Sequence, residues 1–243
     1  MPLPSNDLST LAEGANAYSI SLSDKQLGQF ARYKELLLDW NKRINLTAIT
    51  GDQDIQIRHF LDSLSCTLVT GDLSDLSLVD AGTGAGFPGL PLKIFFPELK
   101  LTLVESVSKK TAFLEVVVDE LGLEHVEIIA ERLEVVGQDP DYRESFDWAV
   151  SRGVAKLAVL VEYLLPLCRI GGRALSQKGE GALGASDSAA RVIKLLGGGE
   201  PEIRPVDLPG RQRTHYLIVI PKVYHSPSKY PRRPGIPSKR PLA

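Results

Sequence analysis

Cysteine is scarce in this chain, whose 243 residues include only Cys66 and Cys168. Two cysteines so far apart exclude a disulfide framework, and this usage is typical of a protein of the reducing cytoplasm. Histidine is scarce too, and its four positions show no metal-ligand spacing with the cysteines or with one another, so no metal site is expected. These positions are His59, His125, His215 and His225.

Long apolar runs are also lacking. The most apolar stretch, residues 157–168, is interrupted by Glu162 and Pro166 and is shorter than the ~20 residues that cross a bilayer. The N-terminus has no basic region followed by an apolar core, so a secretory signal is not expected. Apolar residues make up 43% of the chain and charged residues 24%, which is typical of a soluble globular protein. We therefore expect a cytoplasmic protein with no membrane partner.

Acidic residues are missing from the last part of the chain. The net charge is −2, yet residues 221–243 carry six lysines and arginines and no acid, so the preceding 220 residues carry −8. The same segment holds six prolines and two tyrosines, and proline-rich segments stay extended. Such a tail suits a polyanion such as nucleic acid. A solvated terminus that aids solubility is the alternative.

The first 70 residues predict helices. Ser23 and Gln26 fit a capping box, and apolar residues follow at helical spacing, which predicts a helix over 24–41. A second amphipathic pattern predicts a helix over 54–69, after a polar break at 41–47. This part of the chain is expected to form a helical extension.

From residue 76 onward, short apolar runs alternate with helical patterns. Such alternation predicts an α/β protein with a mostly parallel sheet covered on both faces, in a doubly wound topology. Ser108 is expected to cap its helix and Gly122 to end it. The expected strands are 76–80, 101–105, 126–130, 146–151, 171–177 and 215–220, and the expected helices are 88–96, 108–121, 132–136, 156–167 and 183–196.

A glycine-rich stretch, LVDAGTGAGFPG at 78–89, follows the first expected strand. Ligands bind at the carboxyl ends of strands in open parallel sheets, so this loop is a candidate binding site. A phosphate-binding P-loop is excluded because no Gly-Lys-Ser/Thr follows. The glycines from Gly84 to Gly89 do fit the dinucleotide pattern, with Glu105 lying 21 residues further on.

Asp80 argues for a different ligand. Its carboxylate would oppose the pyrophosphate of a dinucleotide, but it would complement S-adenosyl-L-methionine, which carries a sulfonium and an ammonium and no phosphate. Glu105, at the end of the second strand, would then accept hydrogen bonds from the ribose hydroxyls. The sequence therefore favours the methyl donor over NAD. The alternative for Asp80 is that it caps the turn.

Several further stretches carry a more specific resemblance. The chain resembles the bacterial methyltransferases called RsmG, or glucose-inhibited division protein B, from about residue 24 to its end. The first 20 residues match nothing in that family, and Glu105 stands where many relatives have aspartate. The matching stretches are RHFLDSL (58–64), DAGTGAGFPGLPL (80–92), LVESVSKKTAFL (103–114), AERLE (130–134), SRGVAKL (151–157), QKG (177–179) and KYPRRPGIP (229–237).

The resemblance implies a fold and an activity. The fold would be the Rossmann-like class I S-adenosylmethionine-dependent methyltransferase fold, with a seven-stranded sheet. The activity would be methylation of N7 of one guanine (position 527 in the family) of 16S ribosomal RNA, naked or in a small-subunit particle, by a monomer. The expected divisions are a helical extension (1–70), a donor-binding domain (71–221) and a basic tail (222–243).

The expected site residues fall into three groups. The cofactor-binding group is Asp80, Gly82, Gly84, Gly86, Phe87, Glu105, Leu133, Glu134 and Arg152, of which the resemblance alone implies Gly82, Phe87, Leu133, Glu134 and Arg152. The catalytic group is Arg132 and Arg152. The RNA-binding group is Lys109, Lys110, Lys178, Lys229, Arg232 and Arg233, and the residues expected to help close the site are Asn45, Asp62 and Ser63.

The expected reaction needs little side-chain chemistry. Guanine N7 has an exposed lone pair and no proton, so methyl transfer requires positioning and electrostatics but no general base. Three alternatives remain open: a methyltransferase of small molecules, an NAD-linked dehydrogenase, and a non-enzymatic RNA-binding module. The basic tail and the turn at Ser108-Lys109-Lys110 favour an RNA methyltransferase over a methyltransferase of small molecules.

Overall fold

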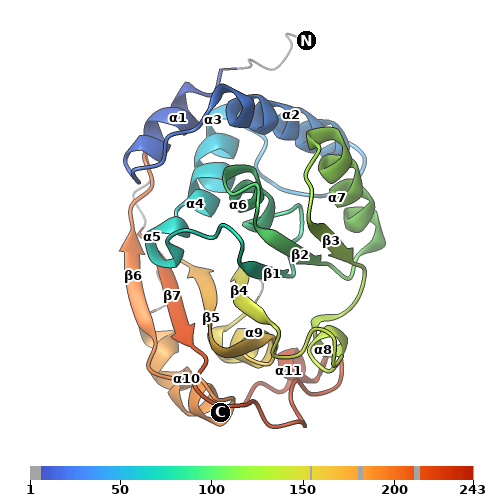
Figure 1. The fold of residues 1–243 in the computed structure, drawn as a ribbon, viewed down its shortest axis with the longest axis vertical. Coiled ribbons are helices and arrows are strands. Elements are labelled where there is room, and N and C mark those ends of the chain that lie inside the picture. The colour runs from blue at the N-terminus through green and yellow to red at the C-terminus, as the bar shows by residue number, and fades with distance from the viewer. Residues whose placement is uncertain (1–6, 154, 180–182, 211–213, 243) are drawn as a thin grey trace.

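A twisted sheet lies at the centre of the molecule (Figure 1). The computed structural model describes residues 7–153, 155–179, 183–210 and 214–242, and within them the sheet has seven strands in the order β3-β2-β1-β4-β5-β7-β6. The strands from β3 to β5 are parallel, and β7 runs antiparallel to both β5 and β6. This arrangement confirms the predicted fold class. The strands are β1 (Ser77–Ala81), β2 (Lys100–Val104), β3 (Val126–Ile129), β4 (Phe146–Arg152), β5 (Cys168–Lys178), β6 (Glu202–Val206) and β7 (His215–Pro221).

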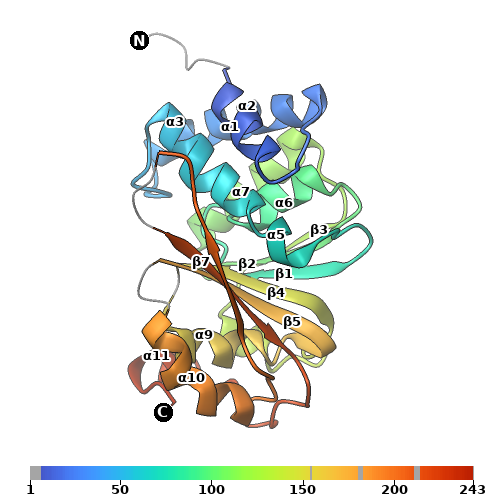
Figure 2. The ribbon, with the colours of Figure 1, turned by 90° about the vertical axis from the view of Figure 1, so that its left-hand side faces the viewer.

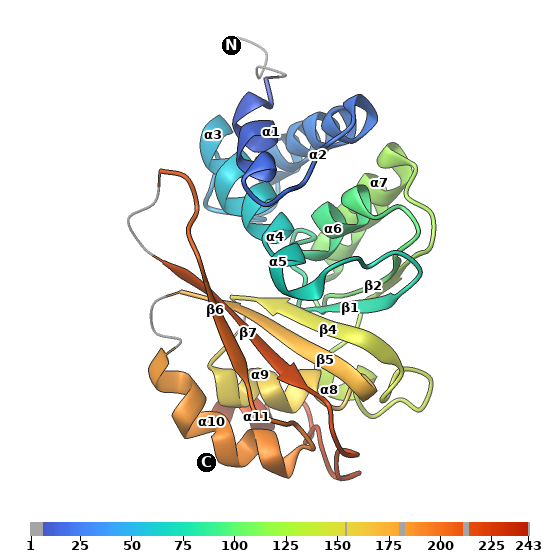
Figure 3. The same ribbon diagram turned by 60° about the vertical axis from the view of Figure 1, so that its left-hand side comes forward.

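Helices cover both faces of the sheet (Figures 2 and 3). The helices from α1 to α7 lie on one face, and those from α8 to α11 on the other. Each face has its own apolar cluster, one built around Phe30, Phe60 and Leu103 and the other around Val79, Leu160 and Ile218. The helices are α1 (Ser9–Asn16), α2 (Asp24–Asn41), α3 (Asp52–Ile55), η1 (Gln56–Leu61), α4 (Asp62–Leu64), α5 (Thr67–Thr70), α6 (Gly89–Phe95), α7 (Ser108–Leu121), α8 (Leu133–Val136), α9 (Leu157–Leu164), α10 (Leu183–Leu195) and α11 (Ile236–Lys239).

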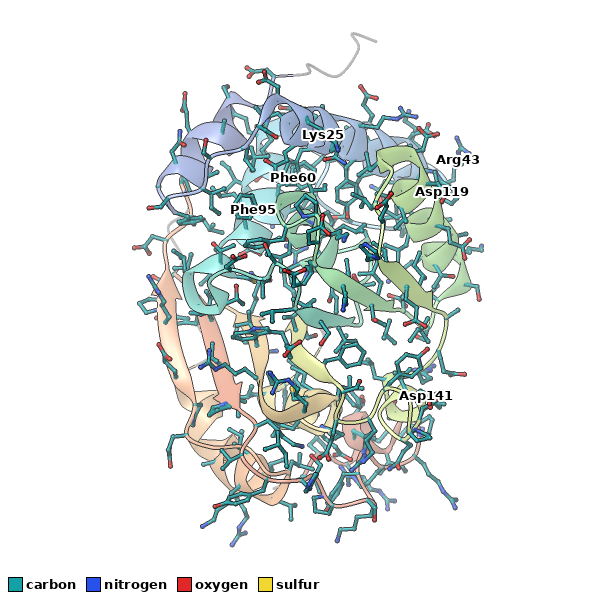
Figure 4. The ribbon with its side chains drawn as sticks, in the orientation of Figure 1. Lys25, Arg43, Phe60, Phe95, Asp119 and Asp141 are labelled. Atoms are coloured by element: carbon teal, nitrogen blue, oxygen red, sulfur yellow. The ribbon has the colours of Figure 1, made fainter. Side chains whose placement is uncertain are left out.

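The distribution of side chains follows from burial of apolar surface. Figure 4 shows Phe60 inside the helical layer and Lys25, Arg43 and Asp119 at its outer rim, where they are exposed. No helix among the described residues is long and apolar enough to cross a membrane.

Local sequence signals determine several element ends. The predicted helix 24–41 is confirmed, and its capping box is reciprocal: the Gln26 N–H donates to Ser23 Oγ, and the Ser23 N–H donates to Gln26 Oε1. Gly122 ends α7 in the left-handed conformation, with φ +59°, as expected for a glycine after a helix. The expected cap at Ser108 is wrong. Val107 occupies the cap position, and Ser108 is the first helical residue.

The expected single helix 54–69 is also wrong in detail. The segment divides into α3, the π-helix η1, α4 and α5. Ser63 Oγ donates to the His59 carbonyl at 2.6 Å, and Ser65 Oγ donates to the Asp62 carbonyl at 2.6 Å. Hydroxyls that bond to backbone carbonyls in this way compete with regular helical bonding. π-turns are frequent at functional sites, and this one carries His59 and leads directly into Asp62.

The C-terminal segment folds back on the helices of the second face. The Lys222 ammonium is buried and donates to the Leu165 carbonyl at 2.7 Å. The Arg232 guanidinium makes a two-pronged ion pair with Glu162, at 2.8 and 2.7 Å, and Tyr230 is buried. The expectation of an extended, free tail is therefore wrong, because acceptors on α9 and near α10 bind two of its cations, Lys222 and Arg232.

Candidate functional site

Two cavities lie at the carboxyl ends of the parallel strands. The first cavity, of about 310 Å³, follows β1, β2 and β3. The second cavity, of about 330 Å³, follows β4 and β5 and is bordered by η1. The first is lined by Gly82, Gly84, Val104, Glu105, Ser106, Lys110, Glu131, Arg132, Leu133, Glu134, Ala155, Tyr163, Gly235 and Ser238. The second is lined by Ile49, Arg58, His59, Asp62, Arg152, Gly153, Gln177, Lys178, Gly179 and His215.

The glycine loop forms one wall of the first cavity. The N–H groups of Gly82 and Thr83 both donate to the Val104 carbonyl, at 3.0 and 3.1 Å, so the loop is tied to the end of β2. Gly84 has φ +64°, and a Cβ built on it would meet no atom within 4 Å. This glycine therefore leaves space on the cavity side, at a backbone conformation that side chains rarely adopt.

Gly86 has a different role from the one expected. It does not line the cavity, and a Cβ on it would lie 2.3 Å from Leu90 Cδ1 and 2.5 Å from the Tyr33 hydroxyl. Its smallness permits the loop to pack on the helical layer.

Asp80 lies beneath the loop and does not line either cavity. It is fully buried, and its Oδ2 accepts hydrogen bonds from Thr83 Oγ1 at 2.7 Å and the Gly89 N–H at 2.8 Å. Burial raises the pKa of Asp80 to about 6, against the opposing effect of these two bonds. Its other oxygen, Oδ1, has no hydrogen-bond partner. The turn-capping alternative thus describes its contacts, and the carboxylate lies behind the loop, outside the lining of the first cavity.

Glu105 stands at the end of β2, as expected. Its Oε1 accepts from the Val107 N–H at 2.9 Å, which fixes the side chain at the rim of the first cavity. Oε2 lies 3.6 Å from the Lys110 ammonium, so the carboxylate is only loosely paired. An acidic group held here can accept hydrogen bonds from a diol.

The far wall of the first cavity comes from α8 and the C-terminal segment. Leu133 and Glu134 line it as expected, together with Arg132. Glu134 Oε1 accepts from the Gly235 N–H at 2.8 Å, and the Tyr163 hydroxyl lies 3.1 Å from Ser238 Oγ. Sequence reasoning missed these tail contacts, since residues about 100 positions apart meet only in the folded chain.

Arg152 belongs to the second cavity and does not line the first one, where sequence reasoning expected it to border the donor. Its Nη1 donates to Asp62 Oδ2 at 3.1 Å and to the Arg58 carbonyl at 3.0 Å, and its Nη2 lies 3.0 Å from His59 Nδ1. His215 Nδ1 lies 3.1 Å from the other oxygen of Asp62. Asp62 is buried, and it therefore fixes a cation from β4 and a histidine from β7.

His59, which contacts Arg152 in this network, is neutral. Burial and the neighbouring Arg152 lower the pKa of His59 to about 3. Because a guanidinium only donates, Nδ1 is an acceptor, and Nε2–H donates to Thr47 Oγ1 at 2.9 Å. For Asp62, burial acts to raise the pKa, but hydrogen bonds and charges from His215 and Arg152 outweigh it, so the pKa is lowered.

Phe87 lies behind both cavities. Its ring stacks on His59, with centroids 4.4 Å apart and planes 5° from parallel, and the Arg152 guanidinium lies 4.8 Å above it. Stacking and cation–π contacts of this kind restrict the two polar side chains to one orientation. Phe87 thus supports the second cavity, whereas sequence reasoning placed it beside the donor.

The remaining expected residues divide by environment. Lys109, Lys229 and Arg233 are exposed, as is Asn45. Lys178 lines the second cavity and donates to the Ala155 carbonyl, and burial lowers its pKa. Lys110 lines the first cavity. Arg232 is paired with Glu162, and Ser63 is buried and donates to the His59 carbonyl.

Comparisons with known proteins agree on one family. The family model described as "GidB: rRNA small subunit methyltransferase G" matches residues 26–205. The chain is 47% identical over 232 residues to the ribosomal RNA small subunit methyltransferase G of Alkaliphilus oremlandii, covering 96% of this chain and 97% of the relative. It is 52% identical over 229 residues to the protein of the same name from Roseiflexus castenholzii, covering 94% and 97%.

Solved structures of lower sequence identity show the same fold. An S-adenosylmethionine-dependent O-methyltransferase from Thermotoga maritima has a TM-score of 0.52 at 16% identity, covering 79% of this chain and 72% of that one. A 16S rRNA adenine-N1-methyltransferase variant from Catenulisporales acidiphilia has a TM-score of 0.51 at 15% identity, covering 64% and 88%. At these identities the likeness shows the fold alone.

Proposed function

The chain belongs to the rRNA small subunit methyltransferase G family, and from this premise we propose that it methylates N7 of one guanine in 16S ribosomal RNA. The methyl donor is S-adenosylmethionine. The observation that carries the proposal beyond family membership is the pair of adjoining cavities at the ends of the parallel strands. One suits a nucleoside-bearing donor, and the other suits a base.

The residues of the first cavity fit the donor. Glycines leave open space at Gly84, Glu105 presents a loosely paired carboxylate to the ribose hydroxyls, and Leu133 offers an apolar surface to the adenine. Glu134, held by Gly235, adds an acceptor on the same wall. When bound, the donor supplies an electrophilic methyl group on a sulfonium. Asp80 stabilises the glycine loop by accepting hydrogen bonds from Thr83 and Gly89.

The two cavities adjoin each other. Gly153 lines the second and Ala155 the first, and the Lys178 side chain crosses between them to the Ala155 carbonyl. A base in the second cavity therefore lies beside the donor cavity. Placing two reactants in this way is the main source of rate when the nucleophile needs no activation.

Methyl transfer to N7 does not need a general base. His59 is neutral with both nitrogens occupied, and His215 donates to Asp62. Guanine N7 carries a lone pair and no proton. The role of Arg152, held on three sides, is to orient the base and the flanking RNA. The rate of methyl transfer should therefore be flat between about pH 6 and pH 8, a range in which histidine normally titrates.

RNA is held by exposed cations. Lys109, Lys229 and Arg233 lie at the surface, and each phosphate they neutralise adds about one unit to the salt dependence of binding. We propose that the protein acts as a monomer. The cytoplasm is the expected location, because the two cysteines are buried and unpaired and this substrate is made there.

A methyl-transfer assay tests the proposal. The protein is incubated with labelled donor and either 16S ribosomal RNA or small-subunit particles, and the product is treated with borohydride and aniline, which cleave RNA at N7-methylguanosine. One cleavage site and about one methyl group per RNA are expected. Label in a small molecule instead of RNA would contradict the proposed substrate. Labelled RNA that is not cleaved would contradict N7 as the methylated atom.

A further inference from the structure

Gln177, at the end of β5, lines the second cavity and has a buried side-chain oxygen without a hydrogen-bond partner. Its Nε2 donates to the Asp62 carbonyl at 2.7 Å. Its Oε1 is buried and has no hydrogen-bond partner, in a residue that is 5% exposed. An unpaired buried polar atom costs about 1–3 kcal/mol, so such an atom in a cavity wall is a candidate contact for a ligand.

The orientation of this amide is determined by its surroundings. The Asp62 carbonyl can only accept, so the amide nitrogen must face it, and a flipped amide would place two oxygens together. Each oxygen of the Asp62 carboxylate already accepts a hydrogen bond, one from Arg152 and the other from His215. Gln177 Oε1 accepts none from the described residues, so it keeps two free lone pairs.

The other walls of the second cavity have the opposite character. Arg152 and Lys178 line it from the ends of β4 and β5, and both carry only donors. A fitting ligand therefore has donors on one edge and acceptors on the other. Guanine has this pattern: its donors, N1–H and the 2-amino group, lie together on the Watson–Crick edge, and its acceptors, O6 and N7, lie on the major-groove side, where O6 adjoins N1. Adenine has a lone pair at N1 and no 2-amino group.

We propose that the second cavity is the pocket of the target guanine, and that Gln177 Oε1 accepts hydrogen bonds from its N1–H and 2-amino groups. The inference rests on the proposed methyl transfer to N7. With the Watson–Crick edge against β5, the edge that carries N7 faces the neighbouring first cavity. Gln177 is thus a specificity residue, which selects guanine and orients N7.

The test combines variants of the protein with a change in the RNA. Gln177→Met removes the acceptor at similar side-chain length. Ser176→Ala is the matched control, since Ser176 is the next residue of β5, is 1% exposed, also has an unpaired oxygen and lines neither cavity. Each protein is assayed in single turnover on RNA with guanosine or inosine at the target position; inosine lacks the 2-amino group.

The parent protein and Ser176→Ala should methylate the guanosine RNA about tenfold faster than the inosine RNA, the effect expected for one lost hydrogen bond of about 1.4 kcal/mol. Gln177→Met should be at least tenfold slower on guanosine and should not distinguish the two RNAs. Donor affinity should be unchanged in all of them.

Two results would overturn the inference. One is a parent protein that treats guanosine and inosine alike, and this result does not depend on whether a variant folds. The other is a Gln177→Met protein that keeps the parent's preference, which would assign Oε1 to an ordered water. Absence of methylation with every protein and RNA would instead contradict the proposed function itself.

Discussion

The pairing of Arg232 with Glu162 offers a test of how the C-terminal segment contributes to the donor cavity. Glu162 is fully buried, and Arg232 binds it through its backbone N–H at 2.9 Å and through two guanidinium bonds. Replacing Arg232 by alanine leaves a buried carboxylate with one hydrogen bond. Breaking a buried ion pair costs about 3–5 kcal/mol.

Here the expected cost is lower. The Arg232 side chain is 25% exposed, so water can partly replace it, and we expect Arg232→Ala to lose about 2–3 kcal/mol of unfolding free energy. For a chain of this size, that loss corresponds to a thermal unfolding midpoint roughly 5–10 °C lower. Because Gly235 and Ser238 lie just beyond Arg232 and line the first cavity, loosening of the segment should also weaken donor affinity about tenfold, or roughly 1.4 kcal/mol.

Arg233→Ala is the matched control. It removes the same charge from the next position, where the side chain is exposed and has no ion pair among those found in the described residues. Its effect on stability should be within about 0.5 kcal/mol, and donor affinity should not change. Thermal unfolding and calorimetric titration with S-adenosylmethionine measure both quantities. Equal effects of the two substitutions would refute the structural role assigned to Arg232.

Further predictions concern the loop and the buried titrating groups. Gly84→Val should remain folded yet lose donor binding at least tenfold in titration, whereas Gly86→Ala should mainly lower the unfolding midpoint, because its Cβ meets Leu90 and Tyr33; the reverse pattern would contradict their assigned roles. Asp80 has a pKa raised from 3.8 to about 6, so its contribution to stability is present below pH 4 and lost as pH rises through 6. Asp80→Asn should therefore gain stability relative to the parent between pH 4 and pH 7, by up to about 3 kcal/mol, and a pH-independent difference in denaturant unfolding would refute this. His59 has a pKa lowered to about 3, so its contribution is present above pH 6.5 and is lost on acidification. The stability difference between the parent and His59→Asn should accordingly narrow by about 2 kcal/mol from pH 7 to pH 5, and a constant difference would argue against a buried neutral histidine.

Much of the fold could be predicted because its signals are local. The capping box at Ser23 and the glycine at 122 mark helix ends within a few residues, and alternating apolar runs identify the parallel strands. β6 was not located. It is a five-residue edge strand that contains Pro205, and proline weakens the strand pattern.

The site was predicted less completely, for a physical reason. Glycines and an acid that follow strands define the first cavity from sequence, and the resemblance added Leu133 and Glu134. The tail contacts, the Asp62–Arg152–His215 network and the free acceptor of Gln177 all depend on residues 70 to 150 positions apart. Charge composition suggested a free basic tail, because a sequence does not show that Glu162 is buried opposite Arg232.

The central claim is methylation of guanine N7 in small-subunit ribosomal RNA. The most direct measurement is mass spectrometry of nucleosides and fragments of that RNA from cells that contain the protein, cells that lack it, and cells that carry Gly84→Val. The account predicts one N7-methylguanosine that is present in the first cells and absent from the other two. An unchanged RNA in cells lacking the protein, or the loss of a methyl group from another atom, would contradict it.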